Sequence, residues 1–167
     1  MKSEVVKFLK STGNYKDITS KEVFFEEVGK LIPLIQEELD ELKESYDLRY
    51  VQGVIDDVID LRIYLIQLES LLERLGCDVI GAKQAVADNN SLKYTSSGAL
   101  VMRWLNEHDN NFSPLKLENP YYISTNEYEG DIYYSLKRRS DDKVSKFVGF
   151  PKVDLDNYTP KEYGGNL

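Results

Sequence analysis

The sequence predicts an all-α fold, a bundle of four to five helices with a small β hairpin near the C-terminus. Through residues 1–93, apolar residues recur every three or four positions, which is the period of a helix with one buried face. From residue 94 onward, tyrosine, glycine and proline become more frequent and alternating patterns begin. We expect a single domain over residues 1–167, in which residues 1–93 form a helical core and residues 94–167 add a helix and the hairpin.

Five helices are expected, over residues 3–12, 18–46, 51–75, 79–89 and 97–108. The second carries Pro33, which should kink or break it because proline lacks a backbone N–H and its ring collides with the preceding turn. The third is apolar around most of its circumference, so it is predicted to be the central and most buried helix. Gly76 should end it.

A hairpin or small meander is expected after the last helix. The stretch YYISTNEYEGDIYYSLKRRSDDKVSKF, residues 121–147, alternates as strands do. The segments EYEGD and SDDK within it carry turn-forming residues.

Bulk composition excludes several kinds of partner. A net charge of −8 argues against binding to nucleic-acid polymers or anionic membranes, which requires basic surface. Binding of phosphorylated small molecules stays possible, since a bound divalent cation reverses the sign of the local charge. No apolar run is long enough to span a membrane. The single cysteine, Cys77, and the absence of a signal-peptide core lead us to expect a cytoplasmic protein.

Two acidic pairs are the most informative feature: Glu38 with Glu41, and Asp57 with Asp60. Each pair has i, i+3 spacing, which puts both carboxylates on one helix face. Arg49 lies midway between Glu38 and Asp60, so helices that fold back there would bring all four acids to one level. Unpaired buried carboxylates are costly, and a cation resolves their repulsion. Oxygen ligands favour Mg²⁺ or Mn²⁺.

Helical geometry ranks the acids of the second helix. The apolar face centres on Ile35, with Glu38 about 60° and Glu41 about 120° from it, while Glu37 lies nearly opposite. On the third helix, the acids at 57 and 60 occupy a narrow gap in the apolar surface, and Tyr64 extends it, followed by Gln67. Solvated acids at i, i+3 are common on exposed helices, but two inward pairs equidistant from one turn favour a shared site.

The run Glu37-Glu38-x-x-Glu41 followed by Asp57-x-x-Asp60 resembles the EExxE…ExxD signature of the MazG-like all-α nucleotide pyrophosphohydrolases. This family is related to the dimeric dUTPases and to phosphoribosyl-ATP pyrophosphohydrolase. Asp57 replaces the usual Glu, which keeps the charge but shortens the side chain by one methylene.

Two further segments resemble phage and bacterial MazG-like proteins. Val86, Asn90 and Lys93 fit V-x-x-x-N-x-S-K, with Leu92 in place of Ser. The ending DDKVSKFVGFPKVDL is similar to D-G-K-V-x-K-P-x-x-F-x-P, with Asp142 for Gly and Phe147 for Pro. These matches suggest the cytoplasm of a bacterium or of a phage-infected host.

The resemblance implies cleavage of a nucleoside triphosphate between its α and β phosphates, giving a monophosphate and pyrophosphate. It implies four metal ligands: Glu38, Glu41 and Asp60, with Asp57 as the fourth. Glu37 or Glu41 would orient or deprotonate the attacking water, and the residues alone do not separate them. It also implies that Lys93 meets phosphate oxygens and Asn90 meets sugar or phosphate. Apart from the resemblance, Tyr94 is a further substrate-binding candidate, because a base could stack on one of the tyrosines of the second half, although strand packing accounts for most of them.

Other interpretations stay open. The departures at residues 57, 92 and 147 are compatible with a non-catalytic helical module that binds a nucleotide or a protein partner. Hydrolysis of phosphoribosyl-ATP is a third possibility, which the added C-terminal hairpin disfavours. Because the central helix is too apolar for one small subunit to cover, we expect a homodimer or homotetramer.

Overall fold

The computed structural model describes residues 1–109 and 120–163, with the backbone alone at residues 108 and 109. The chain forms two compact units. The first comprises Met1–Ala82 and Leu155–Leu167, and the second comprises Lys83–Asp154. The expectation that all 167 residues act as one domain stays a prediction.

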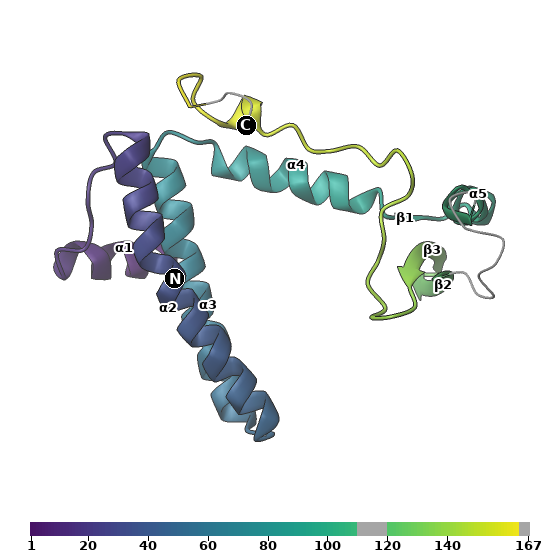
Figure 1. Cartoon of the computed structure of the whole chain (residues 1–167), viewed down its shortest axis with the longest axis horizontal. Helices are drawn as coiled ribbons and strands as arrows, with labels where there is room; N and C mark the ends of the chain where they lie inside the picture. Colours follow the sequence, from purple (N-terminus) through teal and green to yellow (C-terminus); the bar gives the residue numbers. More distant parts are fainter. Residues whose placement is uncertain (110–119, 164–167) are drawn as a thin grey trace. The chain divides into compact units, whose positions relative to one another are not determined.

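Three helices make up most of the first unit: α1 (Lys2–Ser11), α2 (Lys21–Asp47) and α3 (Val51–Arg74). Figure 1 shows α2 and α3 lying side by side as an antiparallel pair, and these two helices share the most extensive helix–helix packing. A short 3-10 helix, η1 (Asp156–Tyr158), returns to this unit. Two buried clusters hold it together: Phe24, Leu31 and Leu71 between α2 and α3, and Val5, Leu9 and Ile66 between α1 and α3.

Helix α2 is continuous over 27 residues, so Pro33 does not break it, and the alternative expectation of a kink there stays a prediction. The helix begins at Ser20, whose hydroxyl accepts a hydrogen bond from the Val23 N–H at 3.3 Å. Pro33 leaves the carbonyl of Gly29 without its helical donor. Both residues are exposed, so water can satisfy that carbonyl and the helix continues.

The turn between α2 and α3 is tight. Arg49 has a positive φ of 55°, and the Tyr50 N–H donates to the Ser45 carbonyl at 2.9 Å. Just beyond the turn, a Cβ added to Gly53 would lie 2.4 Å from the Ser45 hydroxyl oxygen. A glycine facing a small buried serine therefore allows close approach of the two helices at this end.

The second unit packs a helix on a small sheet. Its elements are the end of α4 (Val79–Ser91), then β1 (Tyr94–Thr95), α5 (Gly98–Asp109), β2 (Tyr121–Tyr128) and β3 (Asp131–Arg138). The strands are antiparallel in the order β1-β3-β2. Leu136 and Val101 are fully buried, and the Trp104 ring stacks on Phe147 with centroids 4.7 Å apart.

The helical prediction is confirmed in its coarse form, because the described residues contain five α-helices close to the expected positions. The hairpin is also present, as β2 and β3. It belongs to a three-stranded sheet, since the two-residue strand β1 pairs with β3. Among the described residues, no helix combines the length and apolarity that a membrane crossing requires.

Candidate metal centre

Three carboxylates from the α2–α3 pair converge. Glu38, Glu41 and Asp57 each offer one oxygen, and these atoms all lie within 4.8 Å of one another. We call these three residues the acid cluster. Two of them come from successive turns of α2 and the third comes from the facing helix, so the helical hairpin itself assembles the cluster.

Burial differs sharply within the acid cluster. Asp57 is only 7% exposed, Glu38 is half-buried and Glu41 is exposed. Within the described part of the chain, one oxygen of Glu38, Oε2, and one of Asp57, Oδ2, are buried without a hydrogen-bond partner. A buried polar atom that lacks a partner costs about 1–3 kcal/mol by mutational measures, and a buried charge costs more. A positively charged ligand would satisfy both oxygens.

Burial and neighbouring negative charges both disfavour ionisation of Glu38. Burial raises the pKa of the Glu38 carboxyl, and the charges of Asp60, Glu41, Glu37 and Asp57 raise it further. The pKa of Tyr64 is raised as well, first by burial and then by the negative charge of Glu38 and Asp60. The negative charge of the site thus disfavours ionisation of both Glu38 and Tyr64.

The charge of the whole chain is concentrated in this unit. The first unit carries 19 Asp and Glu against 11 Lys and Arg, while the second carries ten of each, so the net −8 belongs entirely to the first. Net negative charge on this unit favours the approach of cations over that of anions. The oxygens fit a hard divalent cation such as Mg²⁺ or Mn²⁺, which takes carboxylate ligands and completes its shell with water or phosphate oxygens.

The other predicted acids lie nearby with different surroundings. Asp60 is half-buried on α3 and is outside the group of three. It lines a cavity together with Glu38. Glu37 is exposed on the outer side of α2. Their suggested roles, Asp60 as a ligand and Glu37 as the residue that orients water, stay predictions.

The residues predicted to bind substrate belong to the second unit. The Lys93 ammonium donates to the Asn90 side-chain oxygen at 2.5 Å. Tyr94 is exposed on β1 and meets the Tyr133 ring edge-on, with centroids 5.7 Å apart. A substrate role for Asn90, Lys93 or Tyr94 stays a prediction.

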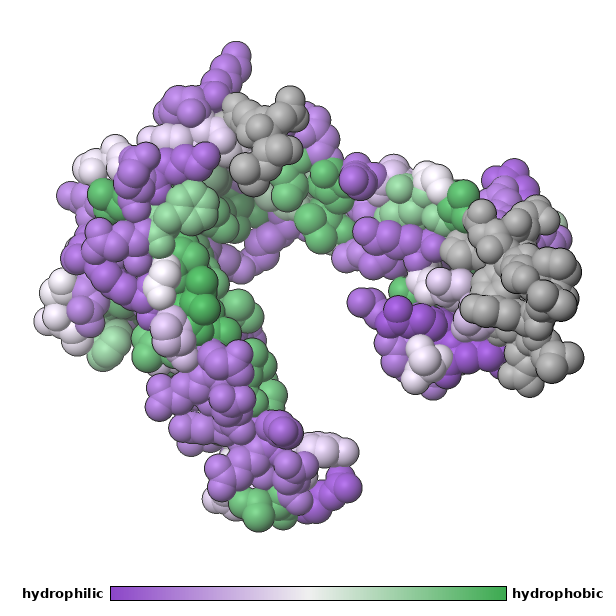
Figure 2. Space-filling view, viewed as in Figure 1, coloured by the Kyte–Doolittle hydropathy of each residue, from purple (hydrophilic) through white to green (hydrophobic). Residues whose placement is uncertain are grey.

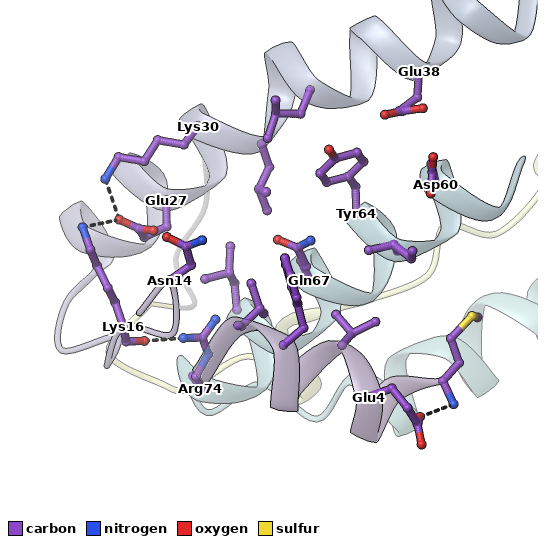
Figure 3. A pocket seen from close by; sticks show the side chains of 18 residues that line it. Glu4, Asn14, Lys16, Glu27, Lys30, Glu38, Asp60, Tyr64, Gln67 and Arg74 are labelled. Atoms are coloured by element: carbon purple, nitrogen blue, oxygen red, sulfur yellow. Dashed lines mark hydrogen bonds and ion pairs between the residues drawn. The ribbon is translucent and has the colours of Figure 1, made fainter. Parts of the chain in front are cut away.

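The sequence interpretation did not foresee the cavity that adjoins these acids. It has a volume of about 840 Å³ and lies within the first unit, between α1, α2 and α3. Figure 3 shows Glu38 and Asp60 at one end of it, Tyr64 beside them, and Gln67 and Asn14 further in. The sequence signal was partial: the stripe formed by residues 60, 64 and 67 was visible, but the packing of α1 against α3 was not.

The chain matches no protein-family model, no curated protein and no solved structure. The acid cluster and the adjoining cavity are therefore the observations from which its function is argued.

Proposed function

We propose that this protein is a divalent-metal-dependent pyrophosphohydrolase of the MazG-like kind, which cleaves a nucleoside triphosphate between the α and β phosphates. The observation that carries the proposal is the pair of buried, unpartnered oxygens on Glu38 and Asp57 within the acid cluster. The family-like motif over residues 37–60 supplies the expected reaction.

Glu38 and Asp57 would hold the cation from the two facing helices, with Glu41 as the exposed third ligand. When bound, the cation supplies positive charge beside the phosphate oxygens and activates water for attack. Mg²⁺ suits this arrangement because it is usually held by one or two carboxylates and shares its shell with substrate phosphate. Phosphate oxygens of the substrate would fill coordination positions that the three carboxylates do not occupy.

The reaction needs one group to take a proton from water. Water attacks the α-phosphorus, the bond from that phosphorus to the α–β bridging oxygen breaks, and pyrophosphate leaves. Glu41 is the exposed member of the acid cluster, so it is the better candidate to accept the proton, and Glu37 is the second. A carboxylate that can exchange with solvent afterwards returns the proton without a relay.

The test is product analysis with each natural dNTP and NTP in Mg²⁺. We expect a nucleoside monophosphate and pyrophosphate in equal amounts. Glu38→Gln and Asp57→Asn should reduce turnover by roughly 10- to 100-fold or more, since even the loss of a group that supports a metal ligand costs that much. Asp56→Asn is the matched control, since Asp56 is the exposed neighbour of Asp57. Orthophosphate as the product, or no turnover of any nucleotide, would contradict the proposal.

Protein association is a second candidate activity, favoured by one specific observation. Many large apolar side chains of the α2–α3 pair are exposed, and Figure 2 shows apolar surface along it. They include Ile32, Leu39, Val51, Ile55, Val58, Ile59 and Leu65. Exposed apolar patches of this kind mark interfaces. We propose a homodimer or homotetramer, and light scattering after size exclusion tests it: a monomer at micromolar concentration would rule it out.

The same surface also suits a non-catalytic module that binds nucleotide or another protein. Calorimetry separates this alternative from the enzyme. Metal-dependent nucleotide binding that yields no products would favour the module, whereas pyrophosphate release by the wild type, lost in Asp57→Asn, favours the enzyme.

A further inference from the structure

The cavity of the first unit shares one residue, Glu38, with the acid cluster. Glu38 and Asp60 form part of its wall at one end. The middle is lined by apolar side chains from all three helices, among them Val5, Leu31 and Ile63. Its volume of about 840 Å³ is within the range of small-molecule sites, which combine apolar walls with a few polar groups that orient the ligand.

Charged groups deeper in the cavity are already paired. Lys16 and Lys30 both contact Glu27, at 3.1 and 2.7 Å. Arg74 donates to the backbone carbonyls of Ser70 and Lys16 and lies over the Tyr15 ring. These cations are engaged by the protein itself. The interior therefore suits an uncharged part of a ligand, while charged phosphates belong at the acid end.

One polar group in the wall remains available. Gln67 is half-buried, and in the described part of the chain its carboxamide has no hydrogen-bond partner. A carboxamide offers two donors and one acceptor. By contrast, the second carboxamide in the wall, Asn14, already donates to the Thr12 hydroxyl at 3.1 Å.

The position of Gln67 matches the dimensions of a nucleoside. Asp60, Tyr64 and Gln67 are spaced i, i+4, i+7, so they form one stripe along α3, as Figure 3 shows. Seven residues span about 10 Å along a helix. This is comparable with the distance from the 5′ oxygen of a nucleoside to the outer edge of its base. An α-phosphate at the acid end would place a base edge beside the amide.

We propose that the cavity receives the nucleoside of the substrate and that Gln67 determines base specificity by hydrogen bonding to the base. The proposal rests on the proposed function for the position of the phosphates. Side-chain carboxamides pair with base edges through one donor and one acceptor. Tyr64, between the acids and Gln67, lies alongside the sugar.

Two measurements on the full-length protein test this. The first is kcat/KM for each nucleotide, and the second is equilibrium dialysis of labelled nucleoside triphosphates and of tripolyphosphate, which has no base. Gln67→Met keeps the shape and removes the hydrogen bonds. It should lower kcat/KM and affinity for the preferred nucleotide roughly 10- to 100-fold and leave tripolyphosphate binding unchanged. Gln52→Met, on an exposed part of the same helix, should change neither.

Gln67→Glu provides a second reading that does not depend on loss of activity. It keeps acceptors and loses the donor, so it should alter the order of preference among bases. Unchanged base preference in both Gln67 variants, with normal turnover, would overturn this inference and leave the proposed function intact. Base-selective binding that weakens in Gln67→Met without any pyrophosphate release would overturn the proposed function and support the inference.

Discussion

Replacing the buried carboxylate Asp57 by asparagine should stabilise the metal-free protein. Asp57 is 7% exposed, and its Oδ2 has no partner among the described residues. Two other acids approach within 4.8 Å of it. Asparagine has nearly the same shape, carries no charge, and offers an N–H donor to the carboxylate of Glu38. The substitution therefore removes a repulsion and can add a hydrogen bond.

The magnitude follows from these contacts. At 4.8 Å and an effective dielectric constant near 20, two full charges repel by about 3 kcal/mol. The actual gain is smaller, because Glu41 is exposed to solvent, which screens its charge. Satisfying a buried oxygen recovers about 1–3 kcal/mol. We expect Asp57→Asn to raise the free energy of unfolding by about 1–3 kcal/mol in EDTA.

Urea denaturation followed by far-ultraviolet circular dichroism measures this difference. Asp56→Asn provides the matched control, because Asp56 is exposed and should change stability by less than about 0.5 kcal/mol. In added Mg²⁺, the wild type should become more stable than Asp57→Asn. At a tenfold excess over its Kd, a ligand stabilises the wild type by about 1.4 kcal/mol, whereas the variant should gain much less.

If Asp57→Asn is no more stable than the wild type in EDTA, while the Asp56 control is neutral, then the Asp57 carboxylate is not strained in the free protein. A cation would then relieve no repulsion at this position.

Three further predictions concern the surrounding fold. Gly53→Ala should destabilise the protein by about 1–3 kcal/mol, because the added methyl group collides with the facing helix. Gly29→Ala, whose methyl group meets nothing within 4 Å, should stabilise it by about 0.5–1 kcal/mol. Thermal unfolding measures whether each variant melts below or above the wild type. Leu136→Ala should cost about 2–5 kcal/mol by tryptophan fluorescence, and Ile132→Ala on the exposed part of β3 clearly less. An NMR titration should give Asp141 a pKa of about 2, because of its ion pair with an arginine, so the contribution of that pair is complete above pH 3.8 and is lost as the pH falls through 2.

The sequence predicted the helical pair and its acids because periodicity is a local signal. Residues 18–46 have one clear apolar face, so the inward position of Glu38 could be read from them. The third helix is apolar nearly all round, and no pattern states which of its faces meets α2. Its rotation is set by tertiary packing, which brings Asp57 rather than Asp60 into the acid cluster.

Features that depend on contacts between distant parts of the chain could not be predicted from local sequence patterns. Strand β1 has two residues and exists only because β3 lies beside it. Pro33 indicated a weak point in α2, yet helix continuity depended on whether the freed carbonyl could reach water. The cavity depends on α1 packing against α3 through Val5 and Leu9, a contact that no local pattern encodes.

The acid cluster has a simple structural origin in the spacing of α2. Leu31, Glu38 and Ser45 are seven residues apart, so they follow one another along the same helix face. Leu31 is buried in the apolar core, and Ser45 is buried against Gly53 near the turn. Glu38 therefore stands at a position of the helix–helix seam that an apolar residue would ordinarily fill.

Helix α3 likewise has an acid in line with a core leucine on the face that packs against α2. Asp57, Tyr64 and Leu71 are also seven residues apart, and Leu71 joins the same apolar core. Close contact at the turn and packing at Leu71 hold the two helices together at both ends of the seam, so the carboxylates between them cannot separate to relieve their repulsion. Hydrophobic burial of each leucine contributes about 1.5–3 kcal/mol, enough to offset an unpartnered oxygen. The proposed cation site would therefore be preorganised, because the fold rather than the ligand maintains the approach of the charges.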